Sequence, residues 1–172
     1  MKKGDLSNFL RKFRLMHLTD RLRYYIQNLQ NHGANSAFKL EHPEVRLPPD
    51  YLIYESFRLD YHKYYFGGKE TAEWIKEQFG RFTTLSDKKI LDWGCGPGRI
   101  IRHLPEVINN NCEFFGTDYN PASIEWCSAN LPGIHFYNNS LNAQLPFPEN
   151  TMDLIFGISI FTHLSENCIW NG

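Results

Sequence analysis

The side chains that could do chemistry gather in one segment, Ile90–Arg99, where an acid precedes three glycines at alternate positions. Asp92 stands two residues before the first glycine, and the glycines are Gly94, Gly96 and Gly98. Glycines permit positive φ and let a ligand lie directly against the backbone. Unpaired N–H groups at the start of a following helix suit an anionic ligand group. The segment therefore predicts a loop that binds a nucleotide or a nucleoside.

The spacing of the glycines separates the classes of ligand that use such loops. A dinucleotide loop has the spacing G-x-G-x-x-G, but Arg99 stands where its third glycine would be. A phosphate P-loop is excluded because no Gly-Lys-Ser/Thr follows. Asp118 lies twenty residues beyond Gly98, and a carboxylate there can accept hydrogen bonds from both ribose hydroxyls. Either class of nucleotide would use such an acid, and Asp118 could instead be a turn residue before Asn120, so Asp118 alone does not separate the classes. Asp92 together with the glycine spacing decides against a dinucleotide.

The elements around this loop alternate between strands and helices. We expect strands at 89–93, 112–118, 133–137 and 152–158, and helices at 99–108 and 121–131. Pro105 should bend or shorten the first of these helices. The last strand is apolar enough to be buried on both faces. This alternation predicts an α/β fold with a parallel sheet and right-handed crossovers.

The N-terminal third of the chain has a different pattern. Residues 6–30 carry apolar side chains at three- and four-residue spacing, which predicts a helix, and the first 30 residues hold seven basic and two acidic side chains. We favour a helix packed on the core with a solvated charged face over one that docks on an anionic membrane or an acidic partner. Residues 31–50 contain Asn, Gly and Pro and are expected to form a loop or linker.

An aromatic-rich stretch leads from this linker to the first strand. It includes Tyr61, Tyr64, Tyr65 and Phe66 and ends at Gly67-Gly68, before a helical pattern over residues 69–79. Ordinary packing of an N-terminal cap is one interpretation of these aromatic side chains. The family resemblance described below implies an equally favoured one, in which they form a lid or line the acceptor pocket.

The composition excludes several classes of protein. The chain of 172 residues has 42% hydrophobic and 22% charged residues and a formal net charge of -1, which excludes wholesale disorder and nucleic-acid binding driven by bulk charge. Its longest apolar stretch, residues 154–161, is far shorter than the ~20 residues that span a bilayer, and no secretory signal is expected. Four widely spaced cysteines without a Cys-x-x-Cys pair predict reduced thiols, no metal site and a cytoplasmic protein.

Three motifs in order resemble those of class I S-adenosylmethionine-dependent methyltransferases. They are Asp92-x-Gly94-x-Gly96-x-Gly98, the strand end Phe115-Gly116-Thr117-Asp118, and the segment 145–164. The resemblance covers roughly residues 50–170 and implies S-adenosyl-L-methionine as the cofactor. It also implies a Rossmann-like parallel sheet, of which this chain carries the first four of seven strands, with an N-terminal helical extension.

The same resemblance sets the expected boundaries. We expect an extension and linker at residues 1–50 and a cofactor-binding domain at residues 51–172, truncated at its C-terminus. The fourth strand would then be an unpaired edge, which a partner chain could cover.

The resemblance further implies a cofactor site. Asp92 would orient the amino group of the methionine moiety, Asp118 would hold the ribose diol, and Tyr119 would lie near the adenine face. Asn139 stands where the family often has an acid on the adenine amine, and its amide oxygen can accept the same hydrogen bond. The expected cofactor-binding residues are Asp92, Gly94, Cys95, Gly96, Gly98, Asp118, Tyr119, Asn139, Ser140, Leu141, Ile158 and Ser159.

The expected reaction is methyl transfer from the sulfonium to an acceptor by in-line displacement. A small molecule or a sugar is favoured as acceptor over nucleic acid. His163 is a candidate general base, although a role in orienting its loop is favoured, and His103 and His135 are expected to be packing residues. Rival functions are a non-catalytic module that binds S-adenosylmethionine, an inactive fragment and, less favoured because of Arg99, an NAD-dependent oxidoreductase.

Overall fold

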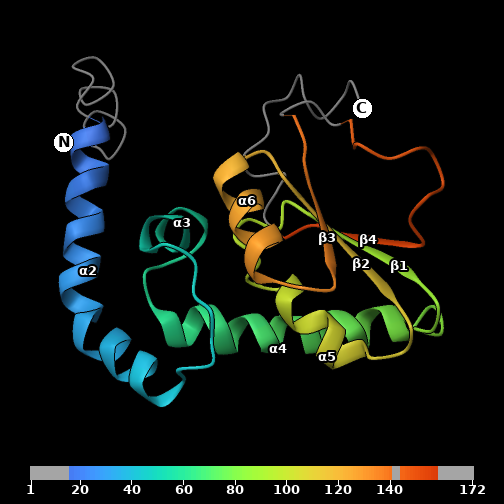
Figure 1. Ribbon diagram of the computed structural model, residues 1–172, viewed down its shortest axis with the longest axis horizontal. Helices are drawn as coiled ribbons and strands as arrows, with labels where there is room; N and C mark the ends of the chain where they lie inside the picture. The colour runs from blue at the N-terminus through green and yellow to red at the C-terminus, as the bar shows by residue number, and fades with distance from the viewer. Residues whose placement is uncertain (1–15, 141–143, 159–172) are drawn as a thin grey trace, which may run out of the picture.

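The computed structural model describes residues 16–140 and 144–158 (Figure 1). The five helices of this part of the chain are α2 (Met16–Glu41), α3 (Asp50–Ser56), α4 (Tyr61–Gly80), α5 (Leu104–Ile108) and α6 (Pro121–Asn130), with a 3-10 turn η1 (Ile101–His103) before α5. The four strands are β1 (Lys89–Trp93), β2 (Glu113–Asp118), β3 (Ile134–Asn138) and β4 (Leu154–Phe156). None of these helices is long and apolar enough to cross a membrane.

The four strands form one parallel sheet in the order β3-β2-β1-β4. The α/β class and the Rossmann-like parallel sheet are therefore confirmed. The first three strands step outward in one direction, and β4 then returns to the other side of β1. In sheets of this kind ligands bind at the carboxyl edge, where the direction of winding changes. The glycine loop follows β1 at that edge.

The main core lies between the sheet and three helices. Ile90 of β1 and Phe114 of β2 pack in one buried cluster with Ala72 and Ile75 of α4 and with Ile124 of α6. Figure 1 shows α4 and α5 side by side beneath the sheet. This core fixes the sheet on α4, and α4 in turn contacts the glycine loop.

The predicted loop at residues 31–50 is wrong for its first part, because α2 continues to Glu41. Asn35 is buried, donates to the Leu59 carbonyl at 3.2 Å and accepts from the Tyr61 backbone N–H at 3.0 Å. Phe38 is buried in a second cluster with Tyr61. These tertiary contacts override the weak helix propensity of Asn and Gly in this segment.

The helix before the first strand is also longer than predicted. α4 begins at Tyr61 rather than Lys69, because the Asp60 side chain accepts from the Lys63 N–H and caps the helix. Gly67 and Gly68 lie inside the helix.

The predicted strand at 152–158 is wrong in its length and its burial. β4 spans only Leu154–Phe156, and Ile155 is 49% exposed. Leu154 and Phe156 pack on the face of the sheet that the helices cover, where the ring centroids of Phe156 and Phe79 are 6.2 Å apart. Ile155 points away from that core because α4, α5 and α6 all cover the same face of the sheet.

Other predicted elements are confirmed within one or two residues. The expected helix at 99–108 is broken into η1 and α5, with Pro105 in the first turn of α5, so the proline shortens the helix as predicted. The division of the chain at residue 50 stays a prediction. α2 nevertheless shares a buried cluster with α3 and α4 through Phe38, Ile53 and Tyr64.

Gly68 permits the close approach of α4 to the glycine loop. A Cβ at this position would overlap the Arg99 carbonyl oxygen, whereas a Cβ at Gly67 would meet nothing within 4 Å. We expect Gly68→Ala to lower the free energy of unfolding by about 1–3 kcal/mol, because backbone must move to admit the methyl group. The matched variant Gly67→Ala should raise it by about 0.4–1 kcal/mol. Urea unfolding followed by circular dichroism measures both, and equal effects would contradict the close approach.

Candidate cofactor site

The loop after β1 turns through three glycines with positive φ. The φ angles of Gly94, Gly96 and Gly98 are 76°, 53° and 80°, which L side chains rarely adopt. The N–H groups of Gly94 and Cys95 both donate to the Thr117 carbonyl, at 2.7 and 2.9 Å. The glycine spacing thus produces the tight turn that the sequence predicts, and the turn is tied to the end of β2.

Side chains from α4, from α6 and from the residue that caps the end of α6 contact this turn. The buried Tyr64 of α4 donates its hydroxyl to the Pro97 carbonyl at 2.7 Å. At Gly98 a Cβ would lie 2.6 Å from the Leu131 side chain and 3.2 Å from the Cys127 sulfur. Tyr64 therefore positions the loop, and it packs as core rather than closing over a ligand. No local signal in the sequence marks this role, because the contact joins residues far apart in the chain.

Asp118 joins the glycine loop directly. Its Oδ2 accepts from the Gly96 N–H at 2.9 Å, and its Oδ1 accepts from the Asn120 N–H at 2.8 Å. Burial raises the pKa of this carboxyl, and the N–H donors of Asn120 and Gly96 oppose that shift. Each oxygen keeps a further lone pair for a ligand hydroxyl. The two motifs that the sequence places twenty residues apart are in hydrogen-bond contact, and the turn role of Asp118 is also present.

Asp92 is buried beneath the loop. Its Oδ2 has no hydrogen-bond partner in the described part of the chain, and the residue is 2% exposed. Burial raises the pKa of its carboxyl to about 8, which Arg99 opposes and Asp118 reinforces. A buried carboxylate without a partner is costly, so this acid either keeps its proton or meets a cationic ligand group. An ammonium group would fit it.

The end of β3 adds a further free acceptor next to Asp118. The Asn139 N–H and the Asn138 side-chain amide donate to the Asp118 carbonyl at 3.0 and 2.8 Å. The Oδ1 of Asn139 is buried and has no partner among the described residues. Tyr119, which follows Asp118 in the chain, is 61% exposed. A carboxylate at the end of β2, the aromatic ring that follows it and an amide oxygen just after β3 thus lie at one edge of the sheet. This combination is expected of a nucleoside site.

The remaining predicted site residues differ in how far the structure places them. Cys95 is buried and burial raises the pKa of its thiol, so it contributes backbone rather than a nucleophile. Ser140 is exposed after β3. Ile158 follows β4, which pairs with β1 at Asp92, so it lies at the same edge of the sheet. Three predicted residues lie outside the described part of the chain: Leu141, Ser159 and His163.

The two other histidines named in the sequence analysis, His103 and His135, lie against aromatic rings. His103 is buried with its ring 4.7 Å from that of Tyr65, and burial lowers its pKa to about 4. His135 is exposed but stacks on Phe115 at 5.1 Å. Packing is confirmed for His103, while His135 lies at the surface.

The residues of α3 were missed by the sequence analysis. Ser56 is the nearest side chain to a Cβ built at Gly96, at 3.4 Å, and Glu55 accepts from the Asn120 side chain at 3.4 Å. The Arg99 guanidinium lies over the Phe57 ring at 4.8 Å from its centroid. The segment that ends α3 therefore borders the loop. The prolines and aromatic residues around it gave no periodic signal for a helix.

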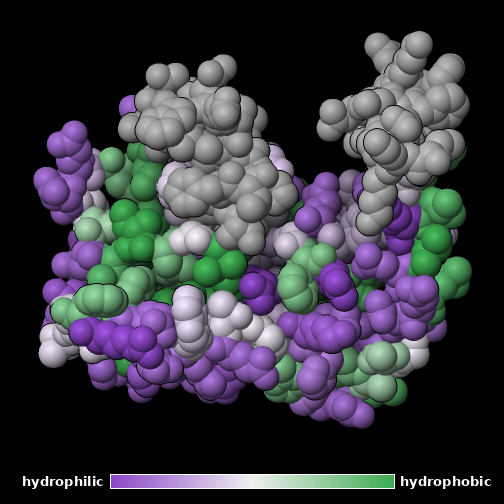
Figure 2. Space-filling view, turned by 180° about the vertical axis from the view of Figure 1, so that it is seen from behind, coloured by the Kyte–Doolittle hydropathy of each residue, from purple (hydrophilic) through white to green (hydrophobic). Residues whose placement is uncertain are grey.

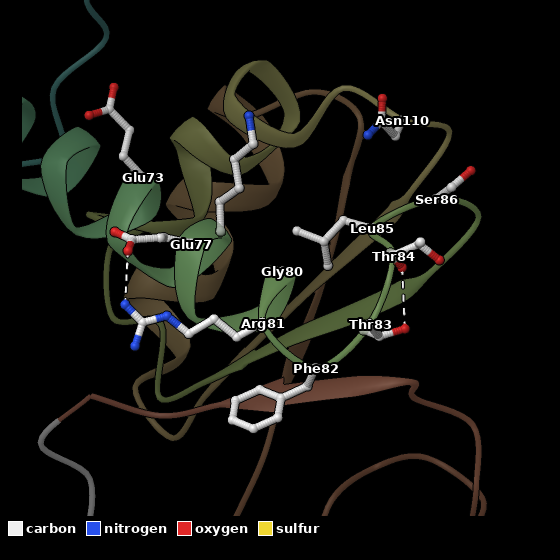
Figure 3. A pocket seen from close by; sticks show the side chains of 11 residues that line it. Glu73, Glu77, Gly80, Arg81, Phe82, Thr83, Thr84, Leu85, Ser86 and Asn110 are labelled. Carbon is white, nitrogen blue, oxygen red and sulfur yellow. Dashed lines mark hydrogen bonds and ion pairs between the residues drawn. The ribbon is translucent and has the colours of Figure 1, made fainter.

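A separate hollow lies at the opposite end of the sheet, around the end of α4 (Figure 3). Three of the four charged side chains that line it bond to neighbouring groups: Arg81 pairs with Glu77 at 2.9 Å, and Lys76 donates to the Val107 carbonyl at 2.8 Å. None of the predicted site residues lines it. It lacks the buried converging polar groups of a cofactor site.

Comparisons with known proteins found one family model and several solved structures that this chain resembles. Residues 90–170 match a family model described as a methyltransferase domain. A solved SAM-dependent methyltransferase from Aquifex aeolicus has 22% identity and a TM-score of 0.45, over 53% of this chain and 50% of that one. A TehB-like SAM-dependent methyltransferase from Corynebacterium glutamicum has 23% identity and a TM-score of 0.41, over 59% and 60%. The chain therefore spans about half the length of the Aquifex aeolicus protein and 60% of the other.

The buried acid Asp92 predicts a characteristic dependence of stability on pH. The unfolded chain releases this proton near pH 4, whereas the folded chain keeps it up to pH of about 8. Stability therefore falls as pH rises between these values, by up to about 1.4 kcal/mol per pH unit. Between pH 5 and pH 8, wild type should lose about 1 kcal/mol or more relative to Asp92→Asn. Urea unfolding at both pH values tests this, and parallel losses would show that the carboxyl is not protonated in the folded chain.

Proposed function

We propose that this chain, whose residues 90–170 match a family model described as a methyltransferase domain, binds S-adenosylmethionine at residues 94–98. With this cofactor it would support methyl transfer to an acceptor. The observation that carries the proposal is the bond from the Gly96 N–H to the Asp118 carboxylate at 2.9 Å. It brings bare loop backbone and a ribose-binding acid into one site at the carboxyl edge of the sheet.

Three free acceptors in this site match the polar groups of the cofactor. Asp118 accepts the ribose hydroxyls with its remaining lone pairs, and Asn139 accepts the adenine amino group with its buried Oδ1. Asp92 receives the ammonium group of the methionine moiety, directly or through water. Pairing with that ammonium favours the charged form of Asp92 and offsets the burial that raises its pKa.

The residues of the chain contribute alignment rather than a catalytic constellation. The bound cofactor supplies an activated methyl group on a sulfonium, so the protein must hold it in line with the acceptor and exclude water. The turn is held by the Tyr64 hydroxyl and packs closely against Leu131, so it provides a fixed platform for this. The assignment of proton removal to His163 stays a hypothesis.

We propose a small molecule or a sugar as the acceptor. The formal net charge of -1 gives no attraction for a polyanion over the whole chain. Labelled S-adenosylmethionine with fractionated metabolites identifies the class of acceptor that takes up the methyl group.

Loss of the Asp118 carboxylate should weaken cofactor binding. In calorimetric titration with S-adenosylmethionine we expect wild type to bind in the micromolar range and Asp118→Ala to bind at least ~10-fold more weakly, since a charged hydrogen-bond acceptor is lost. The matched variant Glu113→Gln changes an exposed carboxylate at the other end of the same strand and should leave the affinity unchanged. Thermal unfolding checks that both variants fold. Equal affinity of wild type and Asp118→Ala would rule out the ribose assignment.

The adenine assignment can be tested by removing the hydrogen bond from either side. Wild type should bind S-adenosylhomocysteine about 5-fold or more tightly than the analogue that lacks the 6-amino group of the purine, because one hydrogen bond is worth ~1 kcal/mol. Asn139→Ala should bind the two ligands within about twofold of one another. A variant that keeps the full wild-type preference would show that another group contacts the amine.

A further inference from the structure

The helix α2 is held to the rest of the molecule by hydrogen bonds of polar side chains and by aromatic contacts of Tyr24 and Phe38. Asp20 accepts from the Tyr54 hydroxyl at 2.8 Å, and Gln27 accepts from the Leu59 N–H at 3.2 Å. Asn35, further along the same side, donates to the Leu59 carbonyl at 3.2 Å. The inward face of α2 is therefore built from hydrogen bonds and aromatic contacts, with little aliphatic burial.

The aliphatic side chains of α2 lie on its opposite face. Five large apolar residues there are between 44% and 76% exposed, and we call them the outer stripe: Leu18, Leu22, Tyr25, Ile26 and Leu29. At about 100° per residue they fall on one side of the helix, opposite Asp20 and Gln27. Figure 2 shows hydrophobic side chains gathered along the outer edge of this helix. A continuous exposed patch of this kind marks an interaction surface.

The charges around the outer stripe indicate what covers it. Arg21 and Arg23 are exposed and project on either side of the stripe. The first 30 residues carry seven basic and two acidic residues, a formal charge of +5, against -1 for the whole chain, which leaves -6 for the rest. One of the two acids, Asp20, is turned inward to Tyr54. The apolar stripe therefore sits in the positive part of the chain.

We propose that the outer stripe of α2 docks the protein on the surface of a lipid bilayer that contains anionic lipids. An amphipathic helix with arginines beside its apolar face lies in the plane of the interface, with leucines below the headgroups and guanidinium groups among the phosphates. α2 forms one outer edge of the molecule (Figure 1), so the stripe can reach a surface without displacing the sheet. A second copy is the poorer occupant, because two such stripes would bring arginines against arginines.

Vesicle flotation with the full chain tests this surface. We expect the protein to float with vesicles of phosphatidylcholine containing about one third phosphatidylserine and to float at least ~10-fold less with pure phosphatidylcholine, since the attraction is electrostatic in part. High salt should weaken the binding for the same reason. The double variant Leu22→Asn, Leu29→Asn should lose it. The matched variant Phe82→Asn removes an apolar side chain that is 86% exposed after α4 and should bind like wild type.

Several outcomes would overturn the proposal. Absence of flotation with anionic vesicles, equal flotation with both vesicle types, or equal loss in the Phe82→Asn variant would each do so. Concentration-dependent dimerisation that the Leu22→Asn, Leu29→Asn variant abolishes, without vesicle binding by wild type, would assign the stripe to a second copy instead. The affinity of the double variant for S-adenosylhomocysteine should equal that of wild type, so the experiments test this proposal and the cofactor site independently.

Discussion

One hydrogen bond of 2.9 Å, from the Gly96 N–H to the Asp118 carboxylate, joins the two parts of the site. It requires that the chain turn sharply after β1, which three residues with positive φ permit, and that β1 and β2 run parallel in adjacent positions. Any sheet order that separated these strands would place the acid beyond reach of the loop. This contact brings the Asp118 carboxylate and the exposed backbone of the loop into one site.

The contacts that hold this turn explain the roles of two residues that would not touch a ligand, Gly68 and Tyr64. Gly68 lets α4 approach the Arg99 carbonyl, and the buried Tyr64 hydroxyl donates a hydrogen bond to the Pro97 carbonyl. A buried tyrosine hydroxyl needs a partner, and here the partner is the loop itself. A rigid loop loses little conformational freedom on binding, so ordering of the site costs little of the free energy of nucleoside binding.

The sequence predicts the sheet and the loop well because their signals are local. β1 is a short strand that runs directly into the glycine loop, and its bounds agree with the prediction. The extents of α2 and α4 were wrong because Asn35 and Asp60 act through contacts and capping that residue type alone does not reveal. The exposure of Ile155 was unforeseen since it depends on which face the helices cover. The role of α3 beside Gly96 likewise arises only in three dimensions.

A crystal structure of the chain with S-adenosylhomocysteine tests the central claim most directly. The account predicts both ribose hydroxyls within hydrogen-bond distance of the Asp118 carboxylate, with the nucleoside lying against the backbone of residues 94–98. A nucleoside bound elsewhere, for example in the hollow beside Arg81 at the far end of α4, or a ribose that leaves Asp118 without a ligand contact, would contradict it.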